Sequence, residues 1–157
     1  MNGHYFLALT VGIGIVAGLR SLTAPAVVAW AAHLSWLNLH GSRLAFIGST
    51  VATVILSLLA VGELIADKLP KTPRRTAAAP LLARFATGAL CGACLSAAVN
   101  RSLLPGALLG GLGGVIGAFA GYEIRRRLVS QLKIKDFVVA TLEDLVAIGL
   151  ACFLVSR

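Results

Sequence analysis

Long apolar stretches separated by short polar segments run along nearly the whole of this 157-residue chain. About 20 consecutive apolar residues are enough to cross the hydrocarbon core of a membrane as an α-helix. The pattern predicts five spans, at residues 5–37, 44–66, 81–99, 106–122 and 137–155. Because the connecting segments are short, we expect residues 1–157 to form one all-α transmembrane domain, a bundle of five helices.

A polar break interrupts the first apolar stretch, where an arginine, two hydroxyl residues and a proline fall between Gly18 and Pro25. We expect one helix to end near Gly18 and a second to begin at Thr23, with Thr23 as N-cap and Pro25 in the first turn. The two parts, residues 5–19 and 24–37, are each shorter than the usual span of about 20 residues. This favours one span broken near residues 18–25, and a count of six segments stays open.

Composition supports a membrane protein: 58% of the residues are hydrophobic, 13% are charged and the mean hydropathy is +0.90. Soluble domains are about 25% charged. The net charge of +8 would suggest nucleic acid in a soluble protein. Here the basic residues flank apolar spans, so we expect anionic lipid headgroups as their neighbours and no nucleic acid as a partner.

Most of the basic residues fall in two segments, 68–84 and 125–135, which are separated by two predicted spans. Lysine and arginine accumulate in the cytoplasmic loops of membrane proteins, so we expect both segments to be cytoplasmic. The C-terminus then lies outside. Five spans would place the N-terminus inside, and six would place it outside.

The fourth predicted span is rich in glycine. Its glycines form two series with a four-residue spacing: Gly106, Gly110 and Gly114, and Gly113, Gly117 and Gly121. Small residues at this spacing let helix backbones approach closely. The partner helix could belong to the same chain or to another copy. Since one copy of so small a chain can barely enclose a path, we expect a homo-oligomer.

A short pattern occurs twice. Arg20-x-x-Thr23 is matched by Arg84-x-x-Thr87, and each copy precedes a helix that ends near a glutamate, Glu63 or Glu123. Internal repeats with interrupted segments are common in transporters. Chance recurrence of arginine and threonine near a helix start is the alternative to duplication.

Three segments carry a resemblance to a known family: GLRSLTAPAVVAWA, GELIADKLPKTPRRTAAAPLLARFATGALCGA and GAFAGYEIRRRL. They resemble the domain of unknown function 4126, a family of small bacterial multi-pass membrane proteins. The resemblance implies an integral protein of the bacterial cytoplasmic (inner) membrane. It implies no established activity, and no catalytic or binding residues come with it.

The charged residues inside the spans are the candidate functional groups. Arg20, Ser21 and Thr23, and by analogy Arg84 and Thr87, could bind an anionic substrate at a helix start. The alternative is structural, with Arg20 paired to Glu63 or Glu143, because charges within a membrane also pair with one another. Arg84 could instead extend to the cytoplasmic edge or pair with Glu143.

Four carboxylates are candidates for proton or cation coupling: Glu63, Asp67, Glu143 and Asp144. Glu63 and Asp67 are four residues apart and so share one helix face. We expect Asp67 to be solvated beside Lys68, whereas the other three lie deeper. Intramembrane carboxylates commonly carry protons or ions in transporters.

Other chemistry receives little support. Cys91 and Cys94 have the spacing of a redox or metal pair, but they lie in an apolar run and suit helix packing better. The sequence lacks the common hydrolase, metalloprotease and phosphate-loop motifs. We therefore expect no enzyme, no metal and no cofactor. The leading interpretation is a small transporter or channel-like carrier for an ion or a small anionic solute or lipid headgroup. The alternative is a structural or lipid-interacting membrane protein.

Overall fold

The structure, a computed structural model, describes residues 3–67, 76–131 and 136–156. This part of the chain is helical, without strands. Its six α-helices and one short 3-10 helix are α1 (Gly3–Leu19), α2 (Thr23–His33), η1 (Ala45–Gly48), α3 (Thr50–Ala66), α4 (Ala78–Ala98), α5 (Leu103–Gln131) and α6 (Asp136–Val155). Parts of the two predicted basic segments, residues 68–75 and 132–135, lie outside the described residues.

Three of these helices are long and apolar enough to cross a membrane: Ala78–Ala98, Leu103–Gln131 and Phe137–Val155. Shorter apolar helices cover Phe6–Leu19 and Thr50–Ala66. The predicted second span is shorter than expected, because η1 and the N-cap Ser49 precede α3. The predicted fourth span is longer than expected, because α5 continues beyond residue 122 to Gln131, into the basic segment 125–135.

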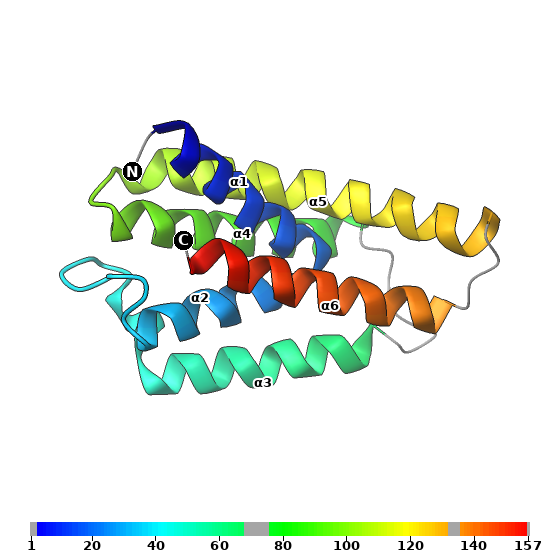
Figure 1. Cartoon of the computed structure of the whole chain (residues 1–157), viewed down its shortest axis with the longest axis horizontal. Coiled ribbons are helices and arrows are strands. Elements are labelled where there is room, and N and C mark those ends of the chain that lie inside the picture. The colour runs from blue at the N-terminus through cyan, green and yellow to red at the C-terminus, as the bar shows by residue number, and fades with distance from the viewer. Residues whose placement is uncertain (1–2, 68–75, 132–135, 157) are drawn as a thin grey trace.

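The first predicted span is not one broken helix that continues across the bundle. α1 runs parallel to α5, with Gly14 near Gly110 and Gly18 near Gly114. α2 runs back along α3, where Trp30 contacts Ser57 and His33 contacts Gly48. The chain therefore reverses at residues 20–22 and forms a helical hairpin, which corrects the prediction of a single span in favour of six helical segments (Figure 1).

The hairpin places both ends of the chain at one end of the molecule. α1 begins and α6 ends on the left in Figure 1, whereas α3 and α5 end on the right. Phe6, Leu37 and Val155 line one pocket at the left end, although they are far apart in sequence. The helix ends that flank the two basic segments thus gather at the opposite end of the bundle.

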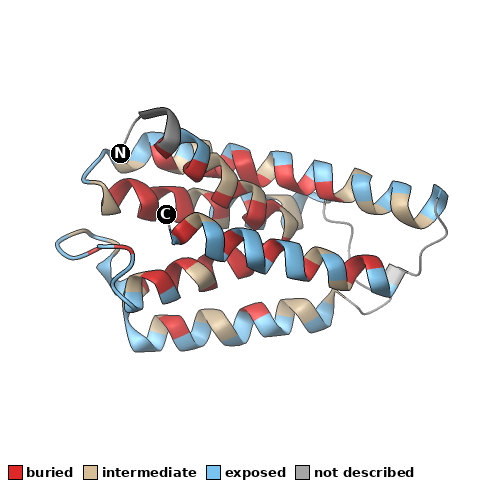
Figure 2. Ribbon diagram, viewed as in Figure 1, coloured by how far each residue is buried: buried red, intermediate tan, exposed pale blue. Residues whose placement is uncertain are grey.

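Close backbone contacts hold α1, α4 and α5 together. A Cβ atom added at Gly110 would meet the carbonyl oxygen of Gly88 in α4, and one added at Gly117 would meet that of Ile15 in α1. Without side chains at these positions, the three backbones approach closely enough for dense packing. Figure 2 shows many buried residues where these three helices meet, and also along α2.

The outer surface of the bundle is apolar. Many large apolar side chains are more than half exposed, among them Val51, Leu58, Leu82, Leu104 and Leu145. Soluble monomers rarely expose contiguous apolar surface on this scale, whereas lipid tails are a favourable environment for it. α3 is the most peripheral helix; it packs on α2 and η1, and of its residues Thr53 and Ala60 are buried (Figure 2).

Candidate functional site: a charged helical hairpin turn

The turn of the hairpin leaves two helix ends inside the bundle. α1 ends at Leu19 and α2 begins at Thr23. The N-cap residue is Leu22, whose apolar side chain makes no capping hydrogen bond, so the prediction that Thr23 is the cap is wrong. Pro25 does lie in the first turn of α2, as predicted. A helix end within an apolar bundle leaves backbone groups that need partners from elsewhere.

Glu63 supplies the missing partner at the start of α2. Its Oε1 accepts hydrogen bonds from the backbone N–H of Ser21 (2.8 Å) and from the Ser21 hydroxyl (2.6 Å). Its Oε2 accepts one from the backbone N–H of Leu22 (2.8 Å). A carboxylate here is also stabilised by the positive end of the helix dipole. The structure thus places the carboxylate of Glu63 where we predicted an anionic ligand, and α3 is tied to the turn.

Arg84 supplies the partner at the end of α1. It is buried in α4, and its Nε donates a hydrogen bond to the carbonyl oxygen of Gly18 (3.0 Å). Its Nη1 also donates to the carbonyl oxygen of Pro80 (3.1 Å). A cation at a helix C-terminus is favourable. The burial of Arg84 corrects the interpretation in which its side chain extends to the membrane edge.

Arg20, between these two helix ends, is fully buried. Its guanidinium forms ion pairs with Asp67 at the end of α3 and with Asp144 in α6. The side chains of both aspartates are about one-tenth exposed. Asp67 is therefore a partner of Arg20 and not a solvated residue as predicted, and the partners expected for Arg20, Glu63 and Glu143, are replaced by the two aspartates.

Three buried polar atoms of the turn lack a hydrogen-bond partner within the described residues: Nε and Nη2 of Arg20 and Oγ1 of Thr23. Of these, Nη2 is ion-paired with Asp144, which leaves Nε and Oγ1 without any partner there. Buried polar groups normally have a hydrogen-bond partner, and the exceptions often mark a site for an ordered water or an ion, or a functional site. Both atoms belong to residues that the sequence singled out as an anion site. The turn therefore retains hydrogen-bonding capacity that the described side chains do not use.

The remaining predicted residues make contacts with residues other than Arg20. Glu143 points to Arg125 of α5, with 3.9 Å between Oε2 of Glu143 and Nη1 of Arg125.

The hydroxyl of Thr87 donates a hydrogen bond to the carbonyl oxygen of Ala83, one turn earlier in the same helix. Glu123 pairs with Arg126 and Arg127 on the surface. The two copies of the Arg-x-x-Thr pattern thus differ in structure, although Arg84 of the second copy donates to the backbone of Gly18, two residues before the first copy.

Some groups that hold the turn have no direct signal in the sequence. The Gly18 carbonyl and the Leu22 amide are backbone groups, and only the tertiary fold brings Arg84 and Glu63 to them. A signal did exist for Asp67. Its four-residue separation from Glu63 places both carboxylates on one face of α3, the face that meets the turn.

These features define a membrane-type helical bundle: apolar helices of spanning length, an apolar exterior, and ion pairs buried around a hairpin turn. Comparison with protein families places residues 7–156 in the family described as domain of unknown function (DUF4126). The chain belongs to this family, which the match covers almost from end to end. No curated protein and no solved structure matches the chain.

Proposed function

We propose that the protein is a small carrier of the bacterial inner membrane, in which the charged hairpin turn binds an ion or a small anionic solute. The observation that carries the proposal is the turn itself: two helix ends inside an apolar bundle, surrounded by Arg20, Arg84, Glu63, Asp67 and Asp144. Discontinuous helices that meet ionisable groups inside the membrane are typical of substrate sites in transporters.

In this proposal, the unsatisfied hydrogen-bond donors of the turn bind the anion. Nε of Arg20 and Oγ1 of Thr23 are buried without a hydrogen-bond partner in the described part of the chain. A carboxylate or phosphate oxygen is the natural acceptor for a guanidinium N–H. Binding a solute there would complete the hydrogen bonding of Arg20. Ser21 donates to Glu63 and would contact the solute only after Glu63 has moved away.

Opening of the site would involve α3. This helix carries both Glu63 and Asp67, and it packs mainly on α2. When α3 moves, Asp67 leaves Arg20 and a solute anion can take its place. The carboxylates Glu63, Glu143 and Asp144 would then accept protons or cations that balance the charge. A homo-oligomer would enclose the path, and anionic lipids would lie against the cytoplasmic basic loops.

A structural role is the second candidate, because one observation favours it. Arg20 is fully buried and already paired with two carboxylates. Removing one partner of a buried pair destabilises a protein strongly, so such a cluster can serve to fix the hairpin in the bundle. In this case the protein would be a non-transporting membrane protein.

A flux assay separates the two candidates. Wild-type protein and Asp144→Asn are reconstituted in liposomes that contain a pH-sensitive dye and are then exposed to gradients of protons and of inorganic phosphate. The carrier predicts that Asp144→Asn lowers flux by about tenfold or more, the effect of losing one charged partner. The yield and helix content of the Asp144→Asn protein should equal those of the wild type.

Glu123→Gln is the matched control, because Glu123 pairs with arginines on the surface. It should transport like the wild type. Wild-type flux no greater than that of empty liposomes, or a parallel loss of flux and folded protein in Asp144→Asn, would favour the structural candidate.

A further inference from the structure

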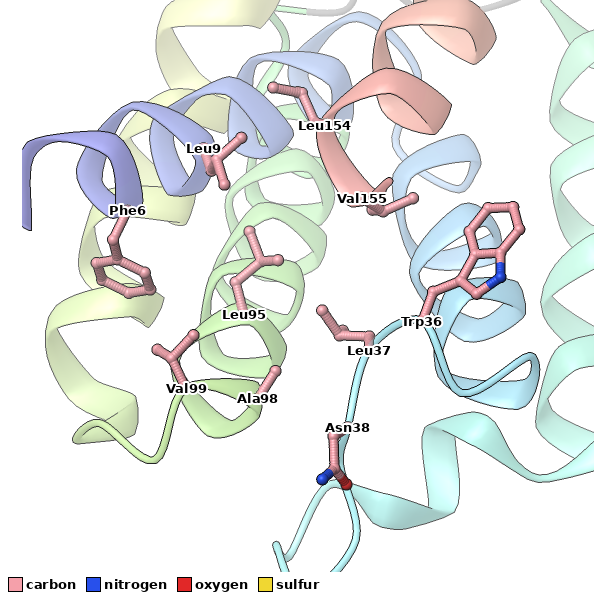
Figure 3. A pocket seen from close by; sticks show the side chains of 10 residues that line it. All are labelled: Phe6, Leu9, Trp36, Leu37, Asn38, Leu95, Ala98, Val99, Leu154 and Val155. Atoms are coloured by element: carbon pink, nitrogen blue, oxygen red, sulfur yellow. The ribbon is translucent and has the colours of Figure 1, made fainter. Parts of the chain in front are cut away.

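A pocket of about 210 Å³ lies at the end of the bundle opposite the charged turn (Figure 3). One wall comes from α1 and α4, with Phe6, Leu95 and Val99; the other comes from the segment after α2 and the end of α6. Nearly all of its lining side chains are apolar. The pocket is therefore separate from the charged hairpin turn, and a ligand for it has to be apolar.

Its size suits part of one hydrocarbon chain. Pockets for drug-sized ligands measure about 300–1,000 Å³, and an apolar cavity of about 150 Å³ is enough for benzene. The pocket, at about 210 Å³, falls between these sizes. Trp36 at its edge is 62% exposed, and exposed tryptophans favour the boundary between membrane and water. A chain entering here would come from a lipid whose headgroup lies at that boundary.

The positive charges at this end of the bundle favour an anionic lipid headgroup. The guanidinium of Arg101 lies 5.0 Å from the centre of the Phe6 ring, which lines the pocket. Arg43, in the loop after α2, is a second exposed cation at this end. The six acidic residues of the chain belong to the other end: in the second half of α3 and its C-cap Asp67, in the second half of α5, and in the first half of α6. The rim is thus cationic, and it complements an anionic headgroup.

We propose that this pocket binds an acyl chain of an anionic phospholipid, whose phosphate lies against Arg101. With the basic segments 68–84 and 125–135 in the cytoplasm, the pocket belongs to the outer leaflet. It is therefore distinct from lipid contacts at the cytoplasmic loops. The assignment does not depend on whether the protein transports a solute.

Tryptophan fluorescence offers a direct test, since the chain has only two tryptophans, Trp30 and Trp36. In Trp30→Phe the emission comes from Trp36 alone. The protein is placed in two vesicle preparations of identical phosphatidylglycerol and phosphatidylcholine content, with bromine on the acyl chains of one lipid or of the other. We expect stronger quenching by brominated phosphatidylglycerol, with an enrichment of up to about fivefold for one arginine contact.

Two further substitutions are made in the Trp30→Phe protein. Ala98→Phe fills the pocket and should reduce quenching to that of bulk lipid, whereas Ala86→Phe, on the exposed face of the same helix, should leave it unchanged. Arg101→Gln should reduce the difference in quenching between the two lipids, and Arg43 accounts for any preference that remains. Circular dichroism checks folding, and Ala98→Leu replaces Ala98→Phe if the larger side chain prevents folding.

Unchanged quenching in the folded pocket-filling variant would overturn the chain site. Equal quenching by the two lipids before Arg101 is replaced would overturn the choice of an anionic headgroup.

Discussion

At the residue scale, the hairpin turn is held by charges that act on backbone groups as well as on each other. Arg84 caps the end of α1, Glu63 caps the start of α2, and Arg20 pairs with two aspartates from different helices. Each charge therefore has a defined counterpart, either a helix terminus or an opposite charge. This explains why ionisable side chains are tolerated inside an apolar bundle.

Replacing Glu63 tests the capping role. Glu63→Ala removes the acceptor of two backbone N–H groups and one hydroxyl, so we expect a loss of about 1–3 kcal/mol in the free energy of unfolding. Glu63→Gln keeps an acceptor oxygen and should lose less. The measurement is unfolding in detergent, followed by circular dichroism.

Glu123→Ala is the control for this measurement, because it removes a carboxylate from an exposed cluster and should have little effect on unfolding. Equal stability of Glu63→Ala and the wild type would show that the start of α2 does not depend on this carboxylate.

At the scale of the elements, the sequence predicted the helices well and their path less well. Apolar length was sufficient to locate α3 to α6, and the polar residues after Gly18 located the break. The direction of the chain after the break could not be predicted, because a short helix of 11 residues is compatible with either path. The reversal depends on contacts between distant segments, such as Ser21 with Glu63, that no local pattern encodes.

Glycine substitutions test how closely α1, α4 and α5 are packed. An added Cβ in Gly110→Ala would meet backbone atoms of Gly88, which cannot move without separating the helices. We expect a loss of about 1–3 kcal/mol, as is usual for overpacking. Gly149→Ala is the matched control, because it lies in α6 with no atom within 4 Å of the added Cβ.

The control should be as stable as the wild type or slightly more stable, since alanine favours a helix over glycine. Unfolding of both variants is measured in the same detergent. If Gly110→Ala were as stable as Gly149→Ala, the close approach of the three helices would be contradicted.

At the scale of the whole molecule, the bundle has two ends with different chemistry. One end holds the hairpin turn, the acidic residues and the helix ends beside the basic segments; the other holds the termini of α1 and α6 and the apolar pocket. Composition predicted a membrane protein, and the position of charged residues inside the predicted spans identified the candidate residues. Neither could predict that Arg20 would meet Asp67 and Asp144, because that contact requires the hairpin to bring α3 and α6 to the same place.

The location of the two termini tests the hairpin most directly, because it decides whether the first apolar stretch crosses the bundle or turns back within it. Alkaline phosphatase, which is active only outside the cytoplasm, and green fluorescent protein, which fluoresces only inside it when exported unfolded, are fused in turn to each terminus. The hairpin predicts phosphatase activity and no fluorescence at both termini. Fluorescence at the N-terminus with phosphatase activity at the C-terminus would contradict it and restore a single broken span.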